Sequence, residues 1–165
     1  MSIKLLNLFI ATQLILSFAF GDSLLGKMAP DFTLLDQSSI NHTLSDYLGK
    51  NIILYFYPKD STPGCTKEAC TFRDSYIEIT NLNAIIFGVS YDSTEKHKYF
   101  KSKLSLPFTL LSDSKGDVTK SYNANGWFFP KRITYIIDTK GVIAKIYDKV
   151  DISSHTKDII EFLSN

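Results

Sequence analysis

The chain has 165 residues, which is enough for one domain with a sizeable core and too few for two ordinary domains. Hydrophobic residues make up 44% of it and charged residues 21%, which excludes a disordered or fibrous protein. The formal net charge of +1 argues against a nucleic-acid partner, because such a partner would require a basic face.

The first 21 residues have the pattern of a secretory signal peptide. A single basic residue, Lys4, precedes an apolar run over residues 5–20. Ala19 and Gly21 occupy the small-residue positions that a signal peptidase prefers. The run is shorter than the roughly 20 apolar residues of a membrane span. We therefore predict export, into the periplasm or a secretory route, with residues 22–165 as a single domain. The alternatives are a membrane-anchored chain and a cytoplasmic one.

The N-terminal part of this domain is expected to contain a strand, a turn, a short helix and a central strand. Residues 29–35 alternate enough to form a short edge strand, and residues 36–41 form a polar turn. Residues 43–49 are typical of one or two helical turns. The run at 51–57 is continuously apolar and rich in branched and aromatic side chains, which indicates a strand covered on both faces. Pro58 ends this strand.

The middle of the chain alternates helices with a buried strand. Residues 59–64 form a loop made of turn and N-cap formers. Over residues 65–82, apolar side chains recur every three or four positions between charged ones, which predicts one amphipathic helix. A second buried strand is expected at 84–90 and a surface helix at 93–103, capped by Ser93.

The C-terminal part is expected to contain a strand, a short helix, a hairpin and a final helix. These elements lie at residues 108–111, 116–122, 132–138 with 142–147, and 153–163. The whole order predicts an α/β fold with a mixed central sheet flanked by helices. A thioredoxin-like fold with inserted elements matches this order best.

The stretch from Pro58 to Cys70 carries the chemistry, because there a buried strand turns into a helix. Backbone N–H groups at a helix start are unpaired, and the helix dipole places about half a positive charge there. At this position the sulfur of Cys65 would be stabilised as a thiolate, which is the nucleophilic form of cysteine. The alternative is that Cys65 is a small buried hydrophobic residue.

Arg132 and Thr62 are the candidate partners of Cys65. A guanidinium stays charged at any working pH, so Arg132 can hold the sulfur ionised and donate to substrate oxygens. Thr62, three residues before Cys65, can place a hydroxyl beside the same spot. The alternatives are that Arg132 is a solvated cation at a strand end and that Thr62 only caps the helix. Glu68, one helical turn from Cys65, either orients Arg132 or is solvated.

Cys70 is the second of the two cysteines. A thiolate that attacks a peroxide becomes a sulfenic acid, which a second thiol traps as a disulfide. In an intact helix the Cα atoms of Cys65 and Cys70 would be roughly 8–9 Å apart, beyond the ~7 Å that a disulfide tolerates. We therefore expect both thiols to be free at rest and the first helical turns to unwind before they oxidise. The alternative is that Cys70 only fills the core.

The residues Pro58, Thr62 and Cys65 follow the pattern PxxxTxxC and resemble the active-site loop of the peroxiredoxins. Pro63-Gly64-Cys65-Thr66 with a cysteine five residues on is similar to the peroxiredoxin Q group, also called bacterioferritin comigratory protein. The resemblance extends from about Leu25 to the C-terminus through residues 29–32, 132–138, 148–150 and His155.

The resemblance implies a thiol-dependent peroxidase that reduces hydrogen peroxide and small organic hydroperoxides. It implies regeneration by thioredoxin or a similar dithiol, no metal and no organic cofactor, and we expect a monomer. Matched by position, Cys65 would be the peroxidatic and Cys70 the resolving cysteine, while Pro58, Thr62 and Arg132 would bind the substrate. The alternative is a thiol–disulfide exchange or redox chaperone protein, which the absence of a CxxC pair disfavours.

The segment before Arg132 departs from the family pattern because it is shorter and more aromatic. Its three consecutive aromatic residues, Trp127, Phe128 and Phe129, are either part of the core or an exposed docking patch. The sequence does not decide between these two roles.

Overall fold

The structure is a computed structural model that describes residues 23–165, so the predicted signal peptide lies outside the described residues. Within 23–165, seven strands form one sheet: β1 (Thr33–Asp36), β2 (Asn41–Thr43), β3 (Asn51–Phe56), β4 (Ala84–Ser90), β5 (Thr109–Ser112), β6 (Ile133–Ile137) and β7 (Ile143–Tyr147). Their order is β2-β1-β5-β4-β3-β6-β7. The central strand β3 runs parallel to β4 and antiparallel to β6, so the sheet is mixed, as the sequence predicts.

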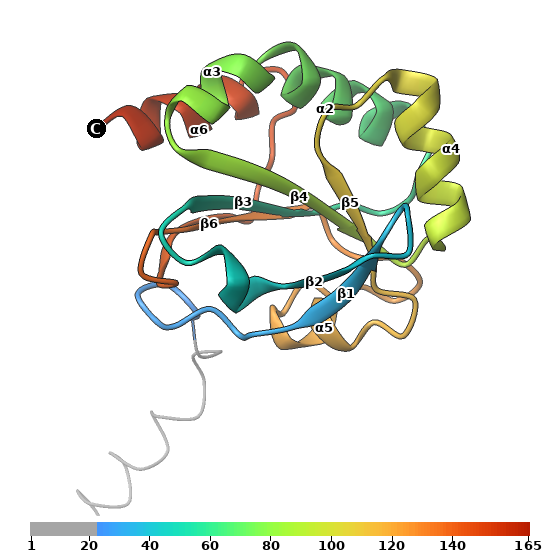
Figure 1. Cartoon of the computed structure of the whole chain (residues 1–165), viewed down its shortest axis with the longest axis horizontal. Coiled ribbons are helices and arrows are strands. Elements are labelled where there is room, and N and C mark those ends of the chain that lie inside the picture. Colours follow the sequence, from blue (N-terminus) through green and yellow to red (C-terminus); the bar gives the residue numbers. More distant parts are fainter. Residues whose placement is uncertain (1–22) are drawn as a thin grey trace, which may run out of the picture.

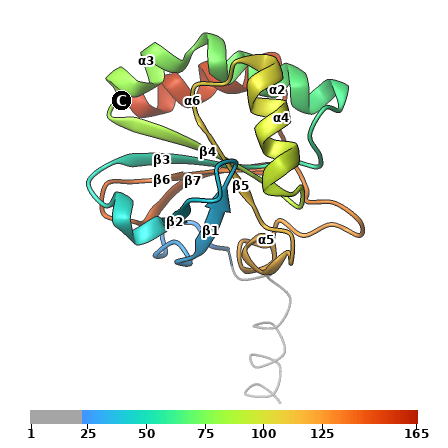
Figure 2. The same ribbon diagram turned by 45° about the vertical axis from the view of Figure 1, so that its right-hand side comes forward.

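Helices lie on both sides of this sheet (Figures 1 and 2). One face carries α2 (Pro63–Asp74), α3 (Tyr76–Asn81), α4 (Thr94–Leu104) and α6 (His155–Ser164), and α5 (Asp117–Ser121) lies on the opposite side. A 3-10 helix, η2 (Leu44–Tyr47), stands where one or two helical turns were expected. The predicted α/β fold with helices flanking a mixed sheet is confirmed.

Burial of both faces of β3 explains its continuous apolar run. Ile53 and Tyr55 face the core under the helices, and Leu54 and Phe56 face the opposite core. All four side chains are at most 1% exposed. The ring of Tyr55 lies over Gly88 of β4, where a Cβ atom would come within 2.7 Å of it, so no larger residue fits at this position. The central strand is therefore held by side-chain packing on both sides.

The first strand is shorter than predicted and is not at the sheet edge. β1 pairs with β2 on one side and with β5 on the other, so the edge strand is β2. The Asp36 carboxylate causes this fold-back: its Oδ1 accepts hydrogen bonds from the backbone N–H of Ser38 at 2.7 Å and of Ile40 at 2.9 Å. These bonds close a tight turn and direct the following residues back along β1.

The single helix predicted over residues 65–82 is also wrong in detail. It begins earlier, at Pro63, and it is interrupted at Ser75, whose φ of −101° and ψ of 8° separate α2 from α3. Asp74 and Ser75 are both weak helix formers, which accounts for the break at this point. α4, in contrast, begins after Ser93 as predicted, and the Ser93 side chain accepts a hydrogen bond from the N–H of Lys96.

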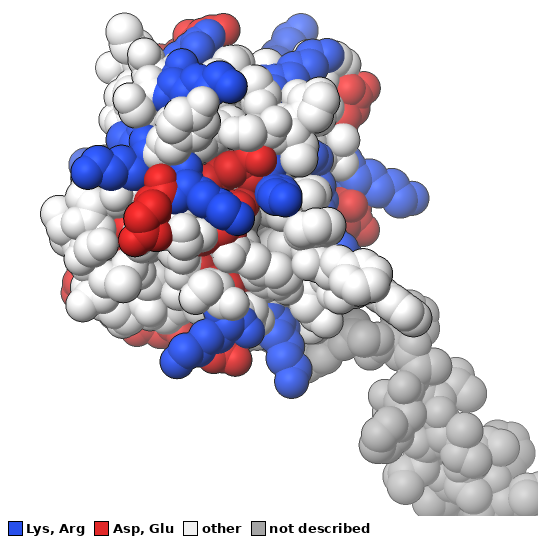
Figure 3. Space-filling view, turned by 90° about the vertical axis from the view of Figure 1, so that its right-hand side faces the viewer, with Lys and Arg blue, Asp and Glu red and all other residues white. Residues whose placement is uncertain are grey.

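Charged side chains are mixed on the face that Figure 3 shows. Lys and Arg alternate there with Asp and Glu, and neither sign covers the face. Among residues 23–165, no helix is long and apolar enough to cross a membrane.

His155 connects α6 to the sheet. It is 2% exposed and its Nε2 lies 2.8 Å from the Thr134 hydroxyl oxygen of β6. Its ring packs edge-on against Phe72 and Tyr147. Burial lowers the pKa of His155 to about 4, against the opposing charge of Asp158.

This depressed pKa predicts a loss of stability in acid. Between about pH 6.5 and pH 4, His155 takes up a proton in the unfolded chain but not in the folded protein. Its contribution to the free energy of unfolding is therefore complete above pH 6.5 and is lost as the pH falls through about 4. At 1.36 kcal/mol per pH unit the loss is about 3 kcal/mol. Urea unfolding at a series of pH values should show this loss as a fall in the stability of the wild type relative to that of His155→Gln, which cannot titrate at this position. Equal pH slopes for the two proteins would contradict the prediction.

Candidate active site

The pairing of β3 with β6 brings distant parts of the chain together. Phe56, the last residue of β3, pairs with Ile133, the first residue of β6. The loop that follows β3 therefore lies beside Arg132, which directly precedes β6. α2 begins at the end of this loop and places Cys65 in its first turn. Cys65 and Arg132, 67 residues apart in sequence, meet at this end of the sheet.

Cys65 lies in a cationic environment. It is the third residue of α2 and is 2% exposed. Arg132 directs Nη2 at the Cys65 sulfur, 3.4 Å away. The first N–H groups of a helix have no intrahelical partner, and since Pro63 has no N–H, those of Gly64 and Cys65 provide the positive end of the dipole. The helix start and the guanidinium therefore both favour an anion at this sulfur.

Arg132 is fixed between α2 and β6 rather than free in solvent. Its side chain is 20% exposed and its Nη1 donates to the Glu68 carboxylate. The guanidinium lies over Gly64, where a Cβ atom would be 3.4 Å from Nη2. Burial lowers the pKa of Arg132, but the Glu68 carboxylate and the Cys65 sulfur together raise it above its usual value. Arg132 therefore remains charged beside the sulfur.

Glu68, which the sequence left open between an orienting and a solvated role, is buried and paired with Arg132. It is 1% exposed, and its second oxygen, Oε1, has no hydrogen-bond partner among the described residues. Burial raises the pKa of Glu68 to about 7, against the opposing effect of the Arg132 charge. Near neutral pH the carboxyl group is therefore divided between its charged and neutral forms.

Thr62 and Pro58 shape the loop that precedes Cys65. Thr62 has the extended backbone of an N-cap residue, but its hydroxyl does not cap the helix and instead donates to the carbonyl oxygen of Lys59 at 3.1 Å. The hydroxyl oxygen keeps its lone pairs as acceptors. Pro58 is half-buried and directly follows Tyr57, where β3 has ended.

Cys70 is in the same helix as Cys65, and both thiols are free. Cys65 lies on the buried side of α2, and Cys70 is half-buried. The C-terminal half of α2 is anchored by Phe72, which is 0% exposed, and by Arg73, whose Nη1 donates to the Leu104 carbonyl oxygen at 3.0 Å. Unwinding that joins the two sulfurs would thus be confined to the first turns of α2.

The aromatic segment before Arg132 is exposed and is not part of the core. Trp127 is 97%, Phe128 80% and Phe129 49% exposed. The ammonium group of Lys59, in the loop before Cys65, lies 5.9 Å from the centre of the Phe129 ring. The segment therefore borders the loop that precedes Cys65.

Two buried residues near the site, Asp60 and His97, were not identified from the sequence. Asp60 lies in the loop itself and His97 on α4, and their side chains meet at 2.8 Å. A buried-strand pattern followed by an aspartate was visible in the sequence, but the partner histidine is 37 residues away and nothing local identifies it.

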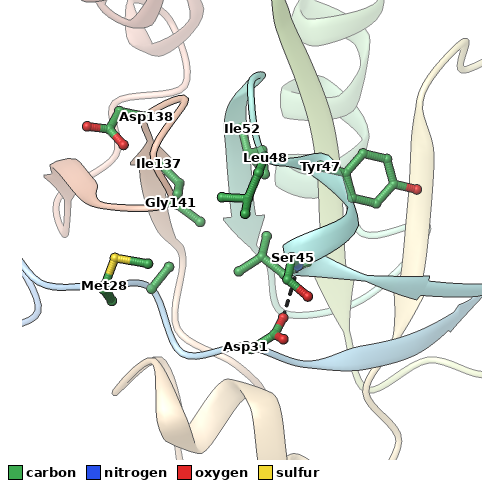
Figure 4. Close-up of a pocket in the computed structure, with 11 residues that line it drawn as sticks. Met28, Asp31, Ser45, Tyr47, Leu48, Ile52, Ile137, Asp138 and Gly141 are labelled. Atoms are coloured by element: carbon green, nitrogen blue, oxygen red, sulfur yellow. Dashed lines mark hydrogen bonds between the residues drawn. The ribbon is translucent and has the colours of Figure 1, made fainter.

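An apolar cavity lies at the other end of the sheet and has no part in this site (Figure 4). Ile52 near the start of β3, Ile137 at the end of β6, Met28 and Leu48 line it, and the Ser45 N–H donates to Asp31 at its rim. Among residues 23–165, no group of three or more His, Cys, Asp or Glu side chains is placed to hold a metal ion.

Comparison with known proteins finds relatives that are all described as peroxiredoxins. The model of the AhpC/TSA family matches residues 25–146. The peroxiredoxin Bcp of Bacillus subtilis (strain 168) is 42% identical over 151 residues, which cover 86% of this chain and 95% of that protein. The putative peroxiredoxin bcp of Coxiella burnetii is 42% identical over 82% of this chain and 95% of its own. The chloroplastic peroxiredoxin Q of Suaeda salsa is 42% identical over 85% of this chain and 67% of its own.

Solved structures of such proteins share the fold. Peroxidoxin BcpB from Mycobacterium tuberculosis superimposes with a TM-score of 0.81 at 32% identity, over 87% of this chain and 97% of that one. PrxQ from Xylella fastidiosa superimposes with a TM-score of 0.83 at 28% identity, over 88% and 98%. With the family model matching most of its length, the chain belongs to the AhpC/TSA family, in the peroxiredoxin Q or Bcp group of the peroxiredoxins.

Proposed function

We propose that this peroxiredoxin reduces hydrogen peroxide and small organic hydroperoxides through Cys65. The observation that carries the proposal is the guanidinium of Arg132, 3.4 Å from the Cys65 sulfur at the positive end of α2. A solved relative, the bacterioferritin comigratory protein of Xanthomonas campestris, supports the substrate class, because that protein has alkyl peroxide reduction activity. That structure superimposes with a TM-score of 0.80 at 27% identity, over 87% of this chain and 98% of that one.

The reaction begins with attack of the Cys65 thiolate on the terminal peroxide oxygen. The new S–O bond forms as the O–O bond breaks, which leaves a sulfenic acid on Cys65 and an alkoxide or hydroxide that takes up a proton to become an alcohol or water. Arg132 lies where it can donate to the peroxide while holding the sulfur. Thr62 supplies an acceptor for the peroxide hydrogen, and Pro58 closes the loop behind it.

Cys70 completes the cycle. Its thiol gives up a proton and the thiolate attacks the sulfur of the Cys65 sulfenic acid; the S–OH bond breaks and the leaving hydroxide takes up a proton to become water, so that a disulfide forms within one chain. A dithiol protein such as thioredoxin then reduces this disulfide by exchange. Since both cysteines belong to one helix, no second chain is needed and we expect a monomer. We expect export on the pattern of residues 1–21, in which case the dithiol partner belongs to the same compartment.

Replacing each cysteine tests the two roles separately. Cys65→Ser should abolish peroxide consumption without unfolding the protein, because a serine hydroxyl does not ionise at neutral pH. Cys70→Ser, the matched control in the same helix, should consume one equivalent of peroxide without reductant and then stop as a sulfenic acid. Peroxide assay and mass spectrometry measure both. Retained turnover in Cys65→Ser would refute the proposal, and slow thiol loss in the wild type would favour a disulfide-exchange or redox chaperone protein.

Arg132→Gln tests the guanidinium. Glutamine retains a donor but no charge, so the second-order rate constant for oxidation of Cys65 should fall by about 100-fold or more, as when a transition-state donor is removed. Stopped-flow mixing with hydrogen peroxide gives this constant. Lys131→Gln, at the neighbouring exposed cation, is the control and should react like the wild type. A fast Arg132→Gln variant would show that the helix start alone activates the sulfur.

Glu68→Gln should change how stability depends on pH. Glu68 ionises near pH 4.5 in the unfolded chain and near pH 7 in the folded protein. Its contribution to the free energy of unfolding is therefore complete below pH 4.5 and is lost as the pH rises through about 7. This loss amounts to about 3 kcal/mol at 1.36 kcal/mol per unit. Urea unfolding between pH 4.5 and pH 8 should show the stability of the wild type declining relative to that of Glu68→Gln, because all other groups titrate alike in the two proteins. Parallel curves would mean that the buried carboxyl ionises normally.

A further inference from the structure

Asp60, in the loop between β3 and α2, has both carboxylate oxygens bound inside the protein. It is 8% exposed. Oδ1 accepts a hydrogen bond from the Tyr57 hydroxyl at 2.7 Å, and Oδ2 lies 2.8 Å from Nδ1 of His97. His97 is 0% exposed on α4, and its Nε2 lies 3.2 Å from the Leu111 carbonyl oxygen of β5. The loop is therefore tied through one imidazole ring to a helix and a strand.

The hydrogen bonds assign the protons of this ring. A carbonyl oxygen only accepts, so Nε2 of His97 carries a hydrogen and donates it to Leu111. A second hydrogen lies between Nδ1 and the Asp60 carboxylate, because two lone pairs would repel at 2.8 Å. A buried carboxylate without such a donor is strongly unfavourable. The hydrogen bond between Asp60 and His97 is therefore directional, and the position of the loop depends on it.

The backbone next to Asp60 is held in an unfavourable conformation. The Asp60 N–H donates to the Asp92 carboxylate at 2.8 Å, and Asp92 also accepts from the Ser90 hydroxyl at 2.9 Å. The following residue, Ser61, has a φ of +63°, in the left-handed region that serine rarely adopts. Thr62 comes next and is the N-cap residue of α2. Holding Asp60 on both its backbone and its side chain keeps this turn in place.

We propose that Asp60 and His97 form a positioning pair, the loop clamp, that sets the loop carrying Pro58 and Thr62 and the first turn of α2 with Cys65. The inference rests on the proposed peroxidase function of Cys65. Neither residue contacts the peroxide. The clamp acts by fixing where the Thr62 hydroxyl and the first helical N–H groups point, so its loss lowers the rate of Cys65 oxidation.

A similar group elsewhere in the fold provides a control. His42 on β2 lies between Asp36, at 3.1 Å from its Nε2, and the Tyr47 hydroxyl. His97 likewise has an aspartate and, at 3.4 Å from Nδ1, the Tyr57 hydroxyl, but His42 belongs to the β1–β2 edge of the sheet and not to the loop before Cys65. The bond to Asp36 is made by Nε2, so His42→Asn, whose side-chain nitrogen takes the place of Nδ1, removes the bond to the aspartate at a remote place.

Two substitutions of His97 separate its two bonds. The side-chain nitrogen of asparagine takes the place of Nδ1, so His97→Asn can still donate to Asp60. The nitrogen of glutamine takes the place of Nε2, so His97→Gln can still donate to Leu111 but leaves Asp60 without this donor. For each variant, the second-order rate constant of Cys65 oxidation by hydrogen peroxide is measured by stopped flow, and the thermal midpoint by circular dichroism.

We expect His97→Gln to react at least tenfold more slowly than the wild type. His97→Asn should stay within threefold of it, and His42→Asn should react at the wild-type rate even where its thermal midpoint falls. A His97→Gln variant as fast as the wild type overturns the clamp and leaves the peroxidase function intact. A His97→Asn variant as slow as His97→Gln also overturns the clamp, because keeping the hydrogen bond to Asp60 then does not restore the rate of Cys65 oxidation.

A wild-type chain without fast oxidation overturns the peroxidase function itself and the clamp with it. Where His97→Gln does not fold, Tyr57→Phe decides, because it removes only the hydroxyl that donates to Asp60. A rate at least threefold below the wild type supports the clamp, and an unchanged rate overturns it.

Discussion

The contact between Cys65 and Arg132 is the interaction on which the proposed mechanism depends, and the antiparallel register of β3 and β6 produces it. Because Phe56 pairs with Ile133, the residue before β6 lies at the end of the sheet where α2 begins. The start of a helix and a guanidinium then converge on one buried sulfur. Burying an anion is energetically costly, and the start of α2 and the Arg132 guanidinium together offset this cost better than either would alone.

Glu68 shows how the site balances orientation against charge. Its carboxyl group fixes the Arg132 guanidinium, yet its negative charge competes with the Cys65 thiolate for that same cation. Burial raises the pKa of Glu68 to about 7, so near neutral pH a substantial fraction of the group is uncharged. A neutral carboxyl oxygen still accepts a hydrogen bond from arginine. The Arg132 guanidinium therefore stays oriented, and its positive charge stabilises an anion at the Cys65 sulfur more than it would beside a charged Glu68.

The proposed cycle requires the same region to be rigid for attack on the peroxide and mobile for disulfide formation. The anchors are placed on either side of the part that has to move. Asp60 is held before α2, and Phe72 and Arg73 hold the later turns against the sheet and α4. The first turns of α2, with Gly64 and both cysteines, lie between these anchors. Rearrangement can therefore be local and reversible rather than an unfolding of the domain.

The sequence alone determined the features that depend on neighbouring residues. The apolar run of β3, the Ser93 cap of α4 and the loop pattern around Cys65 all follow from periodicity and local backbone chemistry. Only the tertiary structure decided the place of β1 inside the sheet, the burial of Glu68 and the contact between Asp60 and His97. These depend on which side chains meet across many residues of chain, and a local pattern carries no information about such partners.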